Sequence, residues 1–205
     1  MAQPTIHDPV QFFIGIIAND ESLIEKAKKT LANQWDIVQP ESARLDFDSF
    51  TEYYQSEMGT GLIRLWFPLE KKESDEDNPE KPFEGLGQPE DLVRLKWICT
   101  AIELNLADEN ERRVNLDPGY LTEAKIILAS FKDFAHRIYL MQGVFADMQL
   151  VFKGGKYLPR EWTFADYQTA EAQRFFMKLR ESYRDKLKAY IESQLDAIRQ
   201  GNDID

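Results

Sequence analysis

Gln-Phe-Phe-Ile-Gly-Ile-Ile-Ala, residues 11–18, is the stretch on which the predicted fold rests. Its apolar residues follow one another almost without interruption, and the run is short, so it predicts a buried strand. Asn19 or Asp20 can cap the helix expected next, over residues 21–34. Apolar side chains recur there at helical spacing, at Leu23, Ile24, Ala27, Leu31 and Trp35. The chain therefore begins with a buried strand and a helix.

Before residue 117 the sequence predicts the order strand, helix, strand twice in succession. The elements expected there are short extended segments over 35–38 and 44–47, a helical turn over 49–58, a strand over 61–69, a helix from Pro89 and a strand over 112–116. Strand–helix–strand, written twice, is the order of the ferredoxin-like split βαβ core, β-α-β-β-α-β. The predicted fold class is therefore α+β.

Beyond this core the sequence predicts a β-hairpin and a long C-terminal helix. Asp117-Pro118-Gly119 is a turn by composition, and residues 120–131 have helical spacing. A hairpin is expected over 137–141 and 144–152, around Gln142-Gly143. A helix over 169–198 completes a single domain spanning 11–198. The remaining segments are a flexible arm over 1–10, a mobile acidic loop near 70–88 and a tail over 199–205.

Composition limits the classes of function. Apolar residues make up 43% of the chain, yet no run is long enough to span a bilayer, and we expect no signal peptide. A single cysteine, Cys99, excludes an internal disulfide and favours a reducing, cytoplasmic setting. Residues 1–110 carry 10 Lys and Arg against 22 Asp and Glu, a balance of −12. Such an acidic chain is a poor nucleic-acid binder. Residues 111–200 carry 15 against 12, a balance of +3, so a small anionic ligand fits that half best.

Two motifs near the middle of the chain resemble a known family. They are Asn115-Leu116-Asp117-Pro118-Gly119-Tyr120-Leu121 and Lys132-Asp133-Phe134-Ala135-His136-Arg137-Ile138-Tyr139-Leu140, and they are accompanied by Tyr53-Tyr54 with Glu57-Met58-Gly59 and by Trp162-Thr163 with Asp166-Tyr167. Over roughly residues 11–190 the chain resembles the bacterial family catalogued as domain of unknown function 4416. The resemblance implies no reaction, no cofactor and no catalytic residues.

A nucleotide-binding phosphate loop is not present in the glycine-rich segment. That loop requires Gly-x-x-x-x-Gly-Lys-Ser/Thr, because its backbone N–H groups surround phosphates and its hydroxyl reaches Mg²⁺. Here Gly154-Gly155-Lys156 is followed by Tyr157, and Gln149 or Leu150 stands where the first glycine belongs. The segment indicates a hairpin turn.

His136 is the candidate general acid or base, because its ordinary pKa lies near neutrality. In the expected hairpin, with Met141 paired to Val144, His136 lies beside Gln149 and diagonal to Asp147. The sequence therefore favours His136 and Asp147 as catalytic candidates. The alternative is that the two side chains only satisfy each other at a sheet edge.

The expected ligand-binding residues are Arg113, Asp117, Tyr120, Lys132, Arg137 and Gln149. Alternation places Arg137 on the face opposite His136, where a guanidinium needs a carboxylate from the protein or from a ligand. The Asp117 turn, before a helix, could offer N–H groups to an anion. Metal binding has no ligand-spacing motif. The leading hypothesis is binding of, or action on, a small anionic metabolite. The alternative is a non-catalytic structural or interaction module, such as a homo-oligomer.

Overall fold

The computed structural model describes residues 7–72, 85–109 and 111–199. Its centre is β1 (Gln11–Ala18), which pairs antiparallel with β4 (Ile63–Lys71) on one side and β5 (Val114–Leu121) on the other. All eight residues of β1 are buried, as expected from the apolar run. The predicted α+β class is therefore confirmed, and β1 is the strand around which the sheet is built.

The sheet has nine strands and every pairing in it is antiparallel. The path across it is β2-β4-β1-β5-β6-β8-β7, with β3 paired to β4 and β9 paired to β8. The remaining strands are β2 (Trp35–Ile37), β3 (Leu45–Asp46), β6 (Lys125–Ser130), β7 (Ile138–Met141), β8 (Val144–Lys153) and β9 (Lys156–Pro159).

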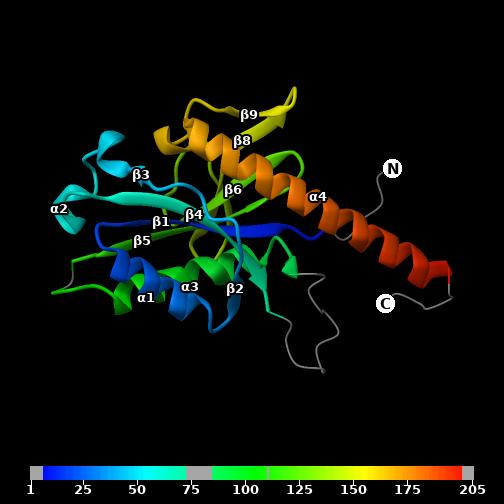
Figure 1. Ribbon diagram of the computed structural model, residues 1–205, viewed down its shortest axis with the longest axis horizontal. Coiled ribbons are helices and arrows are strands. Elements are labelled where there is room, and N and C mark those ends of the chain that lie inside the picture. The colour runs from blue at the N-terminus through cyan, green and yellow to red at the C-terminus, as the bar shows by residue number, and fades with distance from the viewer. Residues whose placement is uncertain (1–6, 73–84, 110, 200–205) are drawn as a thin grey trace.

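Helices cover both faces of the sheet (Figure 1). α1 (Glu21–Leu31) and α3 (Asp91–Asn105) lie on one face, over Phe12, Ile14 and Ile16. α4 (Ala170–Arg199) crosses the other face, where Phe176 packs on Phe13 at 5.0 Å between ring centroids. Strand alternation sends successive side chains of β1 to these two cores. The predicted long C-terminal helix is confirmed, and its far end extends past the sheet.

Short helices cover the part of the α4 face that α4 leaves open. η1 (Phe47–Ser49) and α2 (Gln55–Met58) pack Phe47 and Met58 on Ile17, and η3 (Ala165–Gln168) precedes α4. No helix in the described parts of the chain is long and apolar enough to cross a membrane.

The predicted turn at Asp117-Pro118-Gly119 and the predicted helix over 120–131 are both wrong. β5 continues through the turn residues to Leu121, and β6 occupies most of the expected helix. Pro118 is tolerated because the pairing of β5 with β6 begins only at Gly119, so no β6 residue pairs with Pro118. The spacing of apolar residues in 120–131 was compatible with a helix, but β6 buries four consecutive residues between the two cores.

Two predicted segment boundaries also move. At the end of the arm expected over 1–10, Val10 is buried and forms a β-bridge with Gly87. At the two ends of the acidic loop expected near 70–88, Glu70 and Lys71 belong to β4 and Leu86 is buried. Residues 1–6 and 73–84 lie outside the described residues.

Candidate functional site

A buried arginine crosses the centre of the α4 face. Arg64 of β4 is 1% exposed and lies 2.8 Å from Asp117 Oδ2 and 2.9 Å from Asp166 Oδ2. Its Nη2 also donates to the Tyr167 hydroxyl at 3.3 Å. We call Arg64, Asp117, Asp166 and Tyr167 the Arg64 cluster. It brings together β4, β5 and η3, which lie far apart in the sequence.

The absence of a side chain at Gly15 gives Arg64 its path. Gly15 of β1 pairs with Asp117 of β5, and Arg64 pairs with Ile17, two residues further along β1. A Cβ atom at Gly15 would lie 2.8 Å from the Cζ of Arg64, closer than side chains approach. The guanidinium therefore passes over β1 to reach Asp117. It also lies 5.1 Å from the Trp66 ring, a cation–π distance.

The two aspartates of this cluster respond differently to burial. Burial opposes ionisation of Asp117, but the charges of Arg64 and Lys96 outweigh it and hold the pKa below its ordinary value. At Asp166, burial dominates over the attraction of Arg64 and raises the pKa. The side chain of Asp117 is 22% exposed and that of Asp166 is 5% exposed. Asp117 is thus the aspartate of the cluster that solvent can reach, and its pKa lies below the ordinary value.

A second buried arginine lies on the same face, and it is the one that the sequence singled out. Arg137 Nε donates to Asp147 Oδ2 at 2.7 Å, and its Nη1 donates to Ser130 Oγ at 2.7 Å. Gln149 Nε2 donates to Asp147 Oδ1 at 2.8 Å, and His136 Nε2 lies 3.6 Å from the same oxygen. These five residues form the Arg137 cluster. The hydrogen-bond partners of Arg137 and Asp147 are thus groups of the protein itself.

The hairpin register that separated His136 from Arg137 is wrong. Met141 pairs with Val144 as expected, but a bulge shifts Tyr139 to Phe145, and β7 begins only at Ile138. His136 and Arg137 precede the strand, so alternation does not place them on opposite faces. Both reach Asp147. His136 also stacks on Trp162 at 4.8 Å between ring centroids.

The exposed Lys132 and the half-buried Arg112 meet beside the Arg64 cluster on a pair of tyrosines. Lys132 Nζ donates to the Tyr53 hydroxyl at 2.9 Å and lies 4.8 Å from the Tyr53 ring centroid. Arg112 lies 5.4 Å from the Tyr54 ring centroid, and the two tyrosine rings are 4.9 Å apart. We call Tyr53, Tyr54, Lys132 and Arg112 the tyrosine surface. Burial and the charge of Asp117 raise the pKa of Tyr54, which links this surface to the Arg64 cluster.

Two of the residues expected in the site lie elsewhere. Tyr120 is on the opposite face of the sheet, in edge-to-face contact with Phe12 at 6.1 Å. Arg113 pairs with Asp108 at 3.3 Å, away from Lys132 and Arg137. In the described part of the chain, no group of three His, Cys, Asp or Glu side chains is arranged to hold a metal. Cys99 is buried, and burial raises its pKa.

The sequence interpretation missed Arg64, Arg112, Tyr53, Tyr54 and Asp166 as site residues. The signal for Arg64 was available, because a single charged residue inside the apolar run Leu-Ile-Arg-Leu-Trp-Phe, residues 62–67, needs a buried counter-charge. Nothing in the sequence indicated which carboxylates supply it. Asp117 is 53 residues away, and Asp166 follows an aromatic loop.

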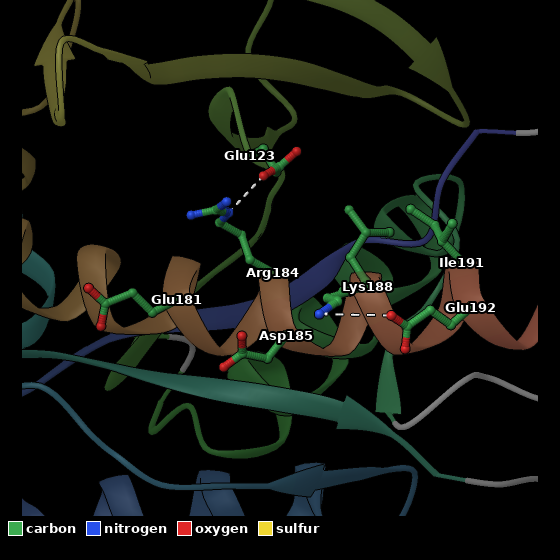
Figure 2. Close-up of a pocket in the computed structure, with 8 residues that line it drawn as sticks. Glu123, Glu181, Arg184, Asp185, Lys188, Ile191 and Glu192 are labelled. Atoms are coloured by element: carbon green, nitrogen blue, oxygen red, sulfur yellow. Dashed lines mark hydrogen bonds and ion pairs between the residues drawn. The ribbon is translucent and has the colours of Figure 1, made fainter.

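A groove elsewhere on the molecule has no free cations in its lining. It lies between the β5–β6 turn and α4, and Figure 2 shows Arg184 directed at Glu123 and Lys188 at Glu192. The two ion pairs measure 2.9 and 3.8 Å. Acidic side chains outnumber basic ones there, so this groove does not suit an anion.

Comparison with known proteins yields one match. The family model described as "Domain of unknown function (DUF4416)" matches residues 8–183. No curated protein and no solved structure matches the chain.

Proposed function

Because this chain belongs to the DUF4416 family, which is defined without a known function, we propose a function from the geometry: the protein binds a small metabolite bearing a phosphate or carboxylate on the tyrosine surface. The observation that carries the proposal is the placement of Lys132 and Arg112 on adjacent tyrosine rings. Lys132 donates to the exposed Tyr53, so that contact can give way to a ligand. Arg112 is held by the exposed Glu57 at 2.8 Å and by the buried Asn115 at 2.9 Å, so an anion would compete with Glu57 for it.

The chemistry around these cations suits a ligand with two kinds of group. Lys132 and Arg112 attract an anion, and Arg112 can hold two of its oxygens. Asp117, partly exposed behind Tyr54, can accept a hydrogen bond from a hydroxyl or amine. The tyrosine rings offer an apolar surface between them. Arg137 and Gln149, which the sequence also suggests as ligand-binding residues, both donate to Asp147.

An enzymatic role would fall to His136 in this proposal. Lys132 and His136 lie in the same loop. That loop is closed by a hydrogen bond from Arg137 to the Lys132 carbonyl. His136 is 21% exposed at its side chain and could exchange a proton with a bound ligand. Asp147 would orient the imidazole.

The test is a thermal-shift and calorimetric screen against nucleotides, sugar phosphates and dicarboxylates. We expect a compound that stabilises the protein and whose affinity falls about tenfold or more in Lys132→Ala and in Arg112→Ala, the loss expected for one charged hydrogen bond. Arg113→Ala is the matched control, because Arg113 is adjacent in sequence but pairs with Asp108. Equal losses in the Arg113 variant, or none in the other two, would refute the proposal.

An interaction module is the second candidate function, and strand β7 favours it. All four residues of β7 are apolar and exposed, at the end of the strand path. Exposed apolar strands at a sheet edge are a common basis of protein association.

Two narrower descriptions belong with these proposals. A ferredoxin-like core is supported by the strand order β2-β4-β1-β5, with α1 and α3 as the crossover helices, although the sheet continues through β6, β8 and β7. A cytoplasmic location is supported by Cys99, the single cysteine.

A further inference from the structure

Strands β7, β8 and β9 form one end of the sheet, and their outward backbone groups are not equally covered by other parts of the chain. Strand β9 has both backbone groups of Tyr157 bonded by the Gln173 side chain, at 3.3 and 2.9 Å. In the stretch of β8 between β7 and β9, Trp162 Nε1 donates to the Met148 carbonyl at 2.7 Å, and Thr163 Oγ1 donates to the Gln149 carbonyl. Side chains thus close the edge along β8 and β9.

Strand β7 has no such protection. It pairs only with β8, and within the described residues no side chain or loop bonds to the outward backbone groups of 138–141. Edge strands are commonly protected by a charge, a proline or a bulge, and of these β7 has only the bulge between Tyr139 and Met141. At the opposite edge β2 carries the exposed Asp36, but β7 is Ile-Tyr-Leu-Met. These side chains are 71, 59, 41 and 48% exposed.

Apolar side chains extend the exposed surface beyond the strand itself. Phe134 is 51% exposed in the loop that leads into β7. Phe131 and Trp97, also exposed, are in edge-to-face contact at 5.0 Å. Phe131 is also the side chain nearest to Gly143, in the turn that joins β7 to β8. A partner at this edge would therefore cover more apolar surface than one strand provides.

We propose that β7 pairs antiparallel with β7 of a second copy of this chain, joining two sheets across a two-fold axis. The proposal makes specific the interaction role given to β7 above and rests on it. Antiparallel pairing of a strand with its own copy is self-complementary, so one apolar surface suffices for a closed dimer. Every other pairing in this sheet is antiparallel as well.

The distribution of charge favours a second copy as the partner. The described residues of the acidic half, 7–72 and 85–109, supply β2, β4 and β1, at the opposite end of the strand path from β7. With strands about 4.8 Å apart, β1 lies roughly 19 Å from β7, beyond the screening length of ~8 Å at physiological salt. Two copies joined through β7 keep β2, β4 and β1 of one copy far from those of the other, so repulsion between these strands is small.

The experiment is light scattering coupled to size exclusion, run on the full chain over a range of concentrations. We expect twice the mass of one chain, with Ile138→Lys weakening dimerisation by about 30-fold or more, the loss typical of a central interface residue. Ile191→Lys, at an exposed apolar residue of α4, should leave the dimer intact. Circular dichroism checks that both variants fold.

A monomer at about 100 μM wild-type protein, well above a Kd of ~10 μM, would overturn the proposal. So would a dimer that survives Ile138→Lys, or one that Ile191→Lys abolishes. As a second measurement on the unmodified protein, amide hydrogen exchange at 138–141 should slow as concentration rises. Exchange there that is independent of concentration would also refute it. Ligand affinity does not enter these measurements, so the dimer and the tyrosine surface can fail separately.

Discussion

Arg64 and Arg137 are both buried on the α4 face, but the protein neutralises them in different ways. Arg137 faces one carboxylate, Asp147, whose oxygens are fully engaged by Arg137 and Gln149. Arg64 faces two carboxylates, and Asp117 keeps part of its side chain exposed to solvent. A cluster with more carboxylates than cations, one of which solvent reaches, can contribute a carboxylate to ligand binding. The difference indicates that the Arg137 cluster holds a loop in place, whereas the Arg64 cluster adjoins the proposed binding surface.

The largest expected effect on stability compares the Arg137 cluster, which has one carboxylate, with the Arg64 cluster, which has two. Asp147→Asn should lower the free energy of unfolding by about 3–5 kcal/mol, because it leaves Arg137 buried without its carboxylate. Asp117→Asn should cost about 1.5–3 kcal/mol, because Asp166 still faces Arg64. Urea denaturation of both variants measures the difference. If Asp117→Asn proved the costlier change, the comparison between the clusters would be reversed.

Next in size is Gly15→Ala, which affects only the Arg64 cluster. Glycine within a strand is ordinarily a weakness, so alanine would usually stabilise. Here the added Cβ displaces the guanidinium from its aspartates, and we expect a loss of roughly 1–3 kcal/mol, as for other overpacked interiors. Urea denaturation gives the sign, and a gain in stability would show that Arg64 has another path to Asp117.

The third effect is a difference in pH dependence between the two aspartates. The pKa of Asp117 is lowered from 3.8, so its contribution to stability is present above that value and is lost as pH falls through the lowered pKa. The pKa of Asp166 is raised from 3.8, so its contribution is present below that value and is lost as pH rises through the raised pKa. From about pH 3 to 7, the loss caused by Asp117→Asn should therefore grow and that caused by Asp166→Asn should shrink. Denaturation at several pH values measures both, and parallel curves would contradict the assignment.

The smallest effect concerns His136 in the Arg137 cluster. His136→Ala should cost about 0.5–1.5 kcal/mol, mainly through the lost stacking on Trp162. His136→Phe keeps the stacking and should be nearly neutral. If both substitutions cost the same in thermal denaturation, the interaction with Asp147, and not the ring stacking, holds His136.

The sequence was informative about elements whose pattern is local. The apolar run of β1, the amphipathic helix α1 and the turn at Gln142-Gly143 all follow from neighbouring residues, and each is present. Prediction failed where two local patterns competed. Asp117-Pro118-Gly119 has the composition of a turn, yet the pairing of β5 with β1 extends it as strand.

The sequence by itself determined the α+β class, a strand at the core and the long final helix. Only the tertiary structure decided which charges meet. Arg64 joins Asp117 and Asp166 because β4, β1 and β5 are neighbours in the sheet and Gly15 leaves room between them. Such partners are set by strand order and register, which depend on contacts between residues far apart in the chain, and no local pattern encodes them.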